Sequence, residues 1–126
     1  MSREHRQSDD DFVEPGVVQV SPAALSLARD FASVVGKKNG KAHIVTFDWA
    51  ESVSVTEAPG ERPKQVGPCL MLGAYERHQV PVGLTHSIDG FEFAVRIPKA
   101  QLSSDGFMID FDPGLLFKLV LRPLSP

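Results

Sequence analysis

Cys69 is the one cysteine of the chain, and a cysteine offers more chemistry than most side chains. A thiolate can act as a nucleophile or as a metal ligand, and His78 lies close to Cys69 in sequence. The chain has no Cys-x-x-Cys, His-x-His or His-Glu-x-x-His spacing, so we expect no metal site and no cofactor. Cys69 remains a candidate reactive or shared-ligand thiol, with a buried small core residue as the alternative. His78 is a weak candidate partner.

Asp110 and Asp112 lie two residues apart in an apolar segment, so on a strand their side chains would share one face. Paired carboxylates can split their pKa values for acid–base work or bind a hard cation. Asp112-Pro113-Gly114 is also typical turn chemistry, in which the aspartate caps its own turn. We interpret Asp112 as a turn residue and keep Asp110 as a weak site candidate that has a structural alternative.

Trp49 is the one tryptophan, and Asp48 and Glu51 flank it. An exposed tryptophan would indicate a binding surface, because aromatic residues are enriched at interaction hot spots. The alternative, which we favour, is a core tryptophan near the end of a hairpin. No Gly-x-Gly-x-x-Gly, Walker or Gly-x-Ser-x-Gly motif is present, so we predict that the protein is not an enzyme.

The composition indicates a small globular protein. The chain has 126 residues, about one domain's worth, and a net charge of −3, which argues against nucleic-acid binding. No apolar run approaches the roughly 20 residues that span a bilayer. The N-terminus does not resemble a secretory signal, and one cysteine fits a reducing compartment, so we expect the cytoplasm. Residues 1–14 are predicted to be a disordered acidic tail and residues 15–126 one domain.

One helix is expected near the N-terminus, after a short strand at 17–20. Ser21 can cap its first turn, and apolar residues at 3.6 spacing predict a helix from about Pro22 to Val35. Gly36 is placed to end it in a left-handed cap. Three residues of this helix are expected in the core: Leu27, Phe31 and Val34.

Beyond residue 41 the apolar period changes to two, which predicts strands. Asp89-Gly90 suits a type I′ hairpin turn, and the proline- and glycine-rich segment 58–68 reads as a long loop. We therefore predict an α+β fold with a twisted, mostly antiparallel sheet and the N-terminal helix packed on it. The expected strands are 43–49, 52–56, 69–75, 84–88, 91–97, 107–111 and 117–121, with a short helical turn at 98–102.

This order resembles the HesB/IscA-like family, the A-type iron–sulfur carriers. The family opens with a short strand, a serine or threonine cap and an alanine-rich helix, like Val18–Leu25 here. Its later half has a glycine-led strand and then a glycine shortly before an Ile-Asp-aromatic strand. Asp89–Leu102 and Gly106–Phe111 match these two parts. The resemblance implies a HesB-like fold over roughly residues 17–121.

The chain departs from the family at the metal ligands. The carriers hold iron with three cysteines, two of them in a C-terminal Cys-Gly-Cys. Here Leu121–Pro126 has no cysteine, and Cys69 lies roughly where the first ligand would be. The resemblance therefore implies a member of the fold that lacks the three-cysteine ligand set and has lost the cluster site.

Three hypotheses follow. The first is a non-enzymatic HesB-like protein-interaction or binding module whose partner is another protein. The second is an iron or iron–sulfur carrier in which Cys69 is shared between subunits. The third is a small enzyme that uses Cys69 with a histidine. The sequence leaves the oligomeric state open.

Overall fold

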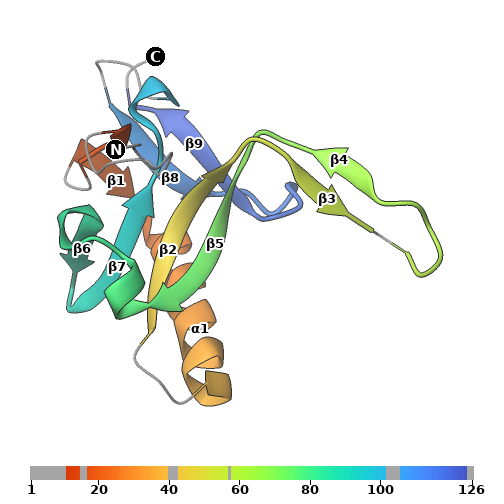
Figure 1. The fold of residues 1–126 in the computed structure, drawn as a ribbon. Coiled ribbons are helices and arrows are strands. Elements are labelled where there is room, and N and C mark those ends of the chain that lie inside the picture. Colours follow the sequence, from red (N-terminus) through yellow and green to blue (C-terminus); the bar gives the residue numbers. More distant parts are fainter. Residues whose placement is uncertain (1–10, 15–16, 40–42, 57, 102–105, 125–126) are drawn as a thin grey trace, which may run out of the picture.

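The computed structural model describes residues 11–14, 17–39, 43–56, 58–101 and 106–124. Within these ranges the chain forms one α-helix and nine strands in three sheets, so the α+β class is confirmed (Figure 1). The elements are β1 Val18–Val20, α1 Pro22–Asn39, β2 His43–Ala50, β3 Val53–Val55, β4 Lys64–Val66, β5 Cys69–Glu76, β6 Thr85–Ile88, β7 Phe91–Arg96, β8 Phe107–Phe111 and β9 Leu119–Pro123. Short 3₁₀ turns lie at 77–79, 82–84 and 99–101.

Helix α1 begins where the sequence predicts. The amide of Ala24 donates to Ser21 Oγ at 3.1 Å, which satisfies one of the orphan amides of the first turn. The predicted stop at Gly36 is wrong, because the helix continues to Asn39 and Gly36 has no positive φ. A glycine permits a left-handed cap but does not force one.

The buried face of α1 combines two alanines with one leucine, Leu25. Ala24 and Ala28 are fully buried, whereas Leu27 and Phe31 are partly buried and Val34 is 56% exposed. The prediction that Val34 lies in the core is therefore wrong. The helix packs on the sheets through Ala24, Leu25 and Ala28, so the predicted stripe lies at the edge of the contact and its end falls outside it.

The largest sheet has the strand order β5-β2-β7-β6. β2 pairs with β5 antiparallel over its whole length and with β7 in parallel, a pairing that the sequence did not predict. β6 and β7 form the predicted hairpin, with φ of 52° at Asp89 and 82° at Gly90. The second sheet has the order β1-β8-β9, in which β1 and β8 are parallel. Four of the six strand pairings are antiparallel, as predicted.

The main core lies between α1 and both of these sheets. Phe47 and Phe93 meet there edge to face, with ring centroids 5.4 Å apart. A smaller apolar cluster, which includes Ile44 and Ala94, covers the opposite face of β2 and β7. These two central strands are therefore buried on both faces, which positions their few polar side chains in apolar surroundings.

The segment before β1 docks on the body. Val13 is 3% exposed and its amide donates to the carbonyl of Ile97 at 2.9 Å, while Phe12 bridges to Pro98. The predicted disordered tail of residues 1–14 is therefore wrong at its C-terminal end, because Phe12 and Val13 supply apolar surface after the acidic run. Residues 1–10 lie outside the described residues.

β3 and β4 form an arm that reaches away from the body (Figure 1). Ala50 pairs with Cys69 at the end of the β2–β5 ladder, and Val53 pairs with Val66 at the start of the β3–β4 ladder. Each partner of the second pair lies three residues from its counterpart in the first pair. The register is therefore unbroken, and the arm continues the β2–β5 hairpin beyond its sheet. The predicted loop at 58–68 is wrong in part, since prolines and glycines flank three residues that can still pair.

Candidate functional site

An apolar pocket of about 320 Å³ lies at the root of the arm. Its walls come from the end of β2 at Trp49, from residues 66–70 at the junction of β4 and β5, and from residues 115–117 and 119–121 before and within β9. Segments far apart in sequence thus meet around one cavity. A cavity of this size with mainly apolar walls is the common form of a binding site for an apolar group.

The structure brings two of the sequence candidates, Trp49 and Cys69, to this pocket. Trp49 lies opposite Leu70 in the ladder and packs against the main core, so the favoured core interpretation holds for its ring. Its indole Nε1 donates to Glu51 Oε2 at 3.1 Å. Trp49 therefore contributes both to the core and to the pocket wall, and its polar edge is hydrogen-bonded to Glu51.

Cys69 is half-buried, and burial raises the pKa of its thiol. The raised pKa favours the neutral thiol over the thiolate, which is the form that attacks substrates and binds metals. His43 and His78 lie at the other end of the β2–β5 ladder, where His43 pairs with Glu76. Because β5 has eight residues, about 23 Å separates its two ends. His78 instead faces Glu76, with Nδ1 3.4 Å from Oε1.

His86 lies on β6, three strands from β5, with its ring edge-on to Phe93. None of the three histidines in the described residues therefore forms a pair with Cys69. The fourth, His5, lies outside those residues.

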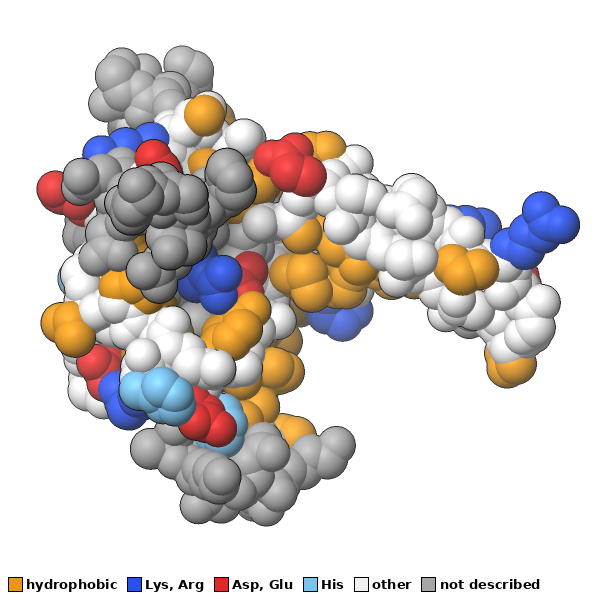
Figure 2. Space-filling model, in the orientation of Figure 1, with side chains coloured by type: hydrophobic (Ala, Val, Ile, Leu, Met, Phe, Trp, Pro, Cys, Tyr) orange, Lys and Arg blue, Asp and Glu red, His pale blue; other side chains and the backbone are white. Residues whose placement is uncertain are grey.

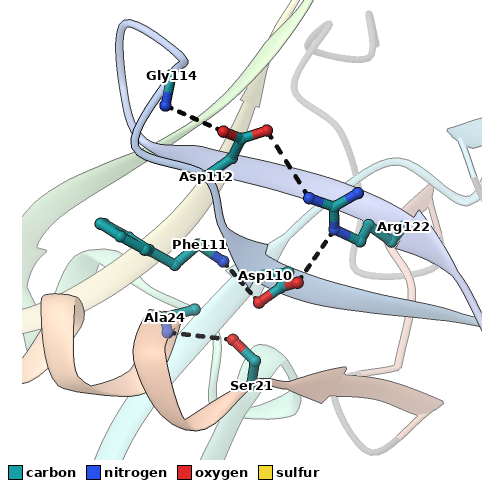
Figure 3. Close-up of polar contacts among 7 residues, drawn as sticks. All are labelled: Ser21, Ala24, Asp110, Phe111, Asp112, Gly114 and Arg122. Atoms are coloured by element: carbon teal, nitrogen blue, oxygen red, sulfur yellow. Dashed lines mark hydrogen bonds and ion pairs between the residues drawn. The ribbon is translucent and has the colours of Figure 1, made fainter.

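Asp110 lies on β8 and is held by three groups that favour its charged form (Figure 3). The Ser21 hydroxyl, the Phe111 amide at 2.8 Å and the Arg122 Nε at 3.0 Å lower the pKa of this carboxyl. Ser21 also caps α1, so Asp110 links β8 to the start of the helix. These contacts support the structural alternative for Asp110.

Asp112 acts in the turn, as the sequence predicts. Its Oδ1 accepts from the amide of Gly114 at 3.0 Å, and its Oδ2 lies 3.7 Å from Arg122 (Figure 3). Arg122 therefore bridges Asp110 and Asp112 and offsets their charge, which disfavours a cation there. Across the described residues, no group of three or more histidine, cysteine or acidic side chains is placed to hold a metal ion.

A polar cluster inside the large sheet was missed by the sequence reasoning. Asp48 on β2 accepts from the Tyr75 hydroxyl at 3.2 Å, and its Oδ1 lies 3.6 Å from Arg96 Nε. The Arg96 guanidinium carbon lies 4.8 Å from the centre of the Tyr75 ring. Burial raises the pKa of Asp48, while the charge of Arg96 opposes the rise. The cluster links β5, β2 and β7.

The same cluster surrounds a glycine. A Cβ at Gly73 would lie 2.5 Å from Asp48 Oδ2 and 2.9 Å from Thr46 Oγ1. Thr46 Oγ1 and Asp48 Oδ1 are buried and have no hydrogen-bond partner among the described residues. The available signal was an aspartate on a largely apolar strand. Only the β2–β5 register, which pairs Gly73 with Thr46, brings the Asp48 side chain over a glycine.

Hydrophobic side chains gather where the arm joins the body (Figure 2). Leu115 and Leu116, which line the pocket, are 42% and 49% exposed. On the arm, Val53, Val55 and Val66 share one face, because Val53 pairs with Val66 and Val55 lies two residues beyond Val53 on the same strand. Trp49 lies on the same face, because it is four residues before Val53 and the register is unbroken between them. We call these six residues the arm–pocket surface.

Comparisons with known proteins give no relative: no family model, curated protein or solved structure matches the chain. The likeness to the A-type carriers therefore stays a hypothesis drawn from the sequence. Among the described residues no helix is long and apolar enough to cross a membrane.

Proposed function

We propose that this protein is a non-enzymatic interaction module that binds another protein through the arm–pocket surface. The observation that carries the proposal is the continuity of the surface: the valine face of the arm runs into an apolar pocket whose outer rim is Leu115 and Leu116. Contiguous exposed apolar surface on a small protein marks interaction sites. Trp49 in the pocket wall is of the residue type most enriched at interface hot spots.

The weak pairing within the arm also favours the proposal that it binds a partner. Its strands are three residues each and pair only with one another, and a two-stranded hairpin is marginally stable in water. A partner packed on its valine face would form a second layer, remove β-branched side chains from water and stabilise the pairing. Burial of apolar surface of this kind is worth about 25 cal/mol per Å².

The geometry gives less support to the shared-ligand carrier and to the cysteine–histidine enzyme. A shared-ligand carrier needs Cys69 as a thiolate, and burial moves its pKa in the opposite direction. A cysteine–histidine enzyme needs a histidine beside Cys69, and the three described histidines lie elsewhere. A HesB-like chain without its cluster ligands fits an interaction role, and this relationship is part of the proposal.

The test is affinity capture from native cell extract with two matched variants. In the first, Leu115→Glu with Leu116→Glu places charge on the pocket rim. In the second, Val82→Glu changes a valine that is 84% exposed in the turn between β5 and β6. We expect the rim variant to lose partners that the wild type and Val82→Glu retain. Equal capture by all three proteins, each folded by circular dichroism, would contradict the proposal.

A further inference from the structure

We propose that the partner of the arm–pocket surface is a second copy of this chain. Two arms pack with their valine faces together, antiparallel about a two-fold axis, and the tip of each reaches the pocket of the other. This inference rests on the proposed function and names the partner of the same surface.

The position of the pocket at the root of the arm allows both tips to reach a pocket in the same dimer. The pocket lies at the root of the arm, and the tip is about eight residues, or roughly 26 Å, away. When two arms of equal length align antiparallel, each tip falls at the root of the other arm. A two-fold contact requires this reciprocity, because every patch on one copy must find its match on the other.

The apolar parts match in the same arrangement. The valine faces of the two arms meet along their length, each covering the surface that the other leaves in water. Beyond the strands, the tip carries Ala58, Pro59 and Pro63, and both prolines are exposed. These residues supply the apolar group that enters the partner's pocket.

The charges are complementary in the antiparallel alignment. The tip carries exposed Glu61 and Arg62, and Figure 2 shows basic side chains at the far end of the arm. The root carries exposed Glu51, which is tied to Trp49, and exposed Lys118, which lies next to Leu119 of the pocket wall. Antiparallel arms place the tip beside root charges of the opposite sign: Arg62 meets Glu51, and Glu61 meets Lys118.

A parallel pair of arms would instead set each tip beside the other tip, and neither tip would reach a pocket, because the pocket lies at the root. The position of the pocket therefore gives the two-fold pair its direction.

The experiment measures self-association of the full chain by sedimentation velocity from micromolar to hundreds of micromolar concentration. The wild type is expected to dimerise, and Leu116→Glu to weaken dimerisation about tenfold or more. Arg62→Glu and Glu51→Arg are each expected to weaken it about tenfold, because each variant places two like-charge contacts in the dimer. The double variant is expected to return to within about threefold of the wild type, since both contacts are then attractive again.

Each outcome decides the inference. A monomer at every concentration overturns it and leaves the proposed function to the capture experiment, where a different protein could still be lost with the rim variant. A dimer that Leu116→Glu does not weaken overturns it as well, because another surface then holds the copies together. A dimer that the double charge variant fails to restore overturns the antiparallel arrangement. Val82→Glu is the control that should dimerise like the wild type.

Discussion

Replacing Gly73 with alanine tests the polar cluster of the large sheet directly. The added Cβ would lie 2.5 Å from Asp48 Oδ2, 2.9 Å from Thr46 Oγ1 and 3.1 Å from Tyr75 Cε2. Asp48 is largely buried and Thr46 fully buried, so neither can move aside into water. Overpacking of this kind costs about 1–3 kcal/mol. At about 4 °C per kcal/mol for a chain of this size, Tm should fall by about 4–12 °C.

Gly36→Ala is the matched control. Gly36 lies within α1, and a Cβ there would meet nothing within 4 Å. Alanine is favoured over glycine in a helix by about 0.5–1 kcal/mol, so this variant should be more stable than the wild type. Thermal unfolding followed by circular dichroism measures both proteins.

A double variant identifies the cause. Asp48→Ala removes the oxygen closest to the new Cβ, so in its presence Gly73→Ala should cost at least about 1 kcal/mol less than it does alone. Two results would refute the reasoning. One is a Gly73→Ala protein as stable as the wild type. The other is a destabilised Gly36→Ala protein, which would mean that the helix ends there in a left-handed cap.

Three further predictions concern titration, metal and the arm. The pKa of Asp48 in the folded protein is raised above its ordinary value of 3.8. Its contribution to the free energy of unfolding is therefore largest below pH 3.8 and falls as pH rises through the folded pKa. Urea titrations should show that fall in the wild type and not in Asp48→Asn; an equal slope in both would contradict it. Purified protein should be colourless, with no stoichiometric iron or zinc and the same Tm with and without chelator, and Cys69→Ser should shift stability by about 1 kcal/mol or less. A brown protein whose colour and dimer are both lost in Cys69→Ser would instead favour the shared-ligand carrier. Gly67→Ala should cost about 1–3 kcal/mol and perturb amide signals of β3 and β4, because its φ is +150° and its Cβ would overlap the Glu51 carbonyl oxygen. Unchanged signals in the arm would show that the root tolerates a side chain.

The features that the sequence predicted correctly depend on contacts between near neighbours. Ser21 caps its own helix, and Asp89-Gly90 sets its own turn, so residue type alone carries the information. The end of α1 was missed for the opposite reason. Gly36 allows two conformations, and the choice between them depends on what lies beyond the helix.

The parallel pairings were also outside the reach of local patterns. β1 pairs with β8 and β2 with β7, and each pair joins segments whose separation in sequence leaves no local trace. The polar cluster follows from these pairings, because Asp48 meets Arg96 across β2 and β7. Trp49 and Cys69 were identified as separate candidates, and only the register of β2 on β5 brings both to one cavity.

The pocket exists because the β2–β5 ladder opens without losing its register. Between the Ala50–Cys69 pair and the Val53–Val66 pair, the chain places Gly67 and Pro68. Proline has no amide hydrogen to donate, and glycine has no side chain to pack, so the ladder is interrupted where the arm leaves the sheet. Segment 115–121 closes the other side of the resulting space. The interruption therefore creates the cavity and frees the arm at the same point, and this is why the proposed two-fold contact uses both.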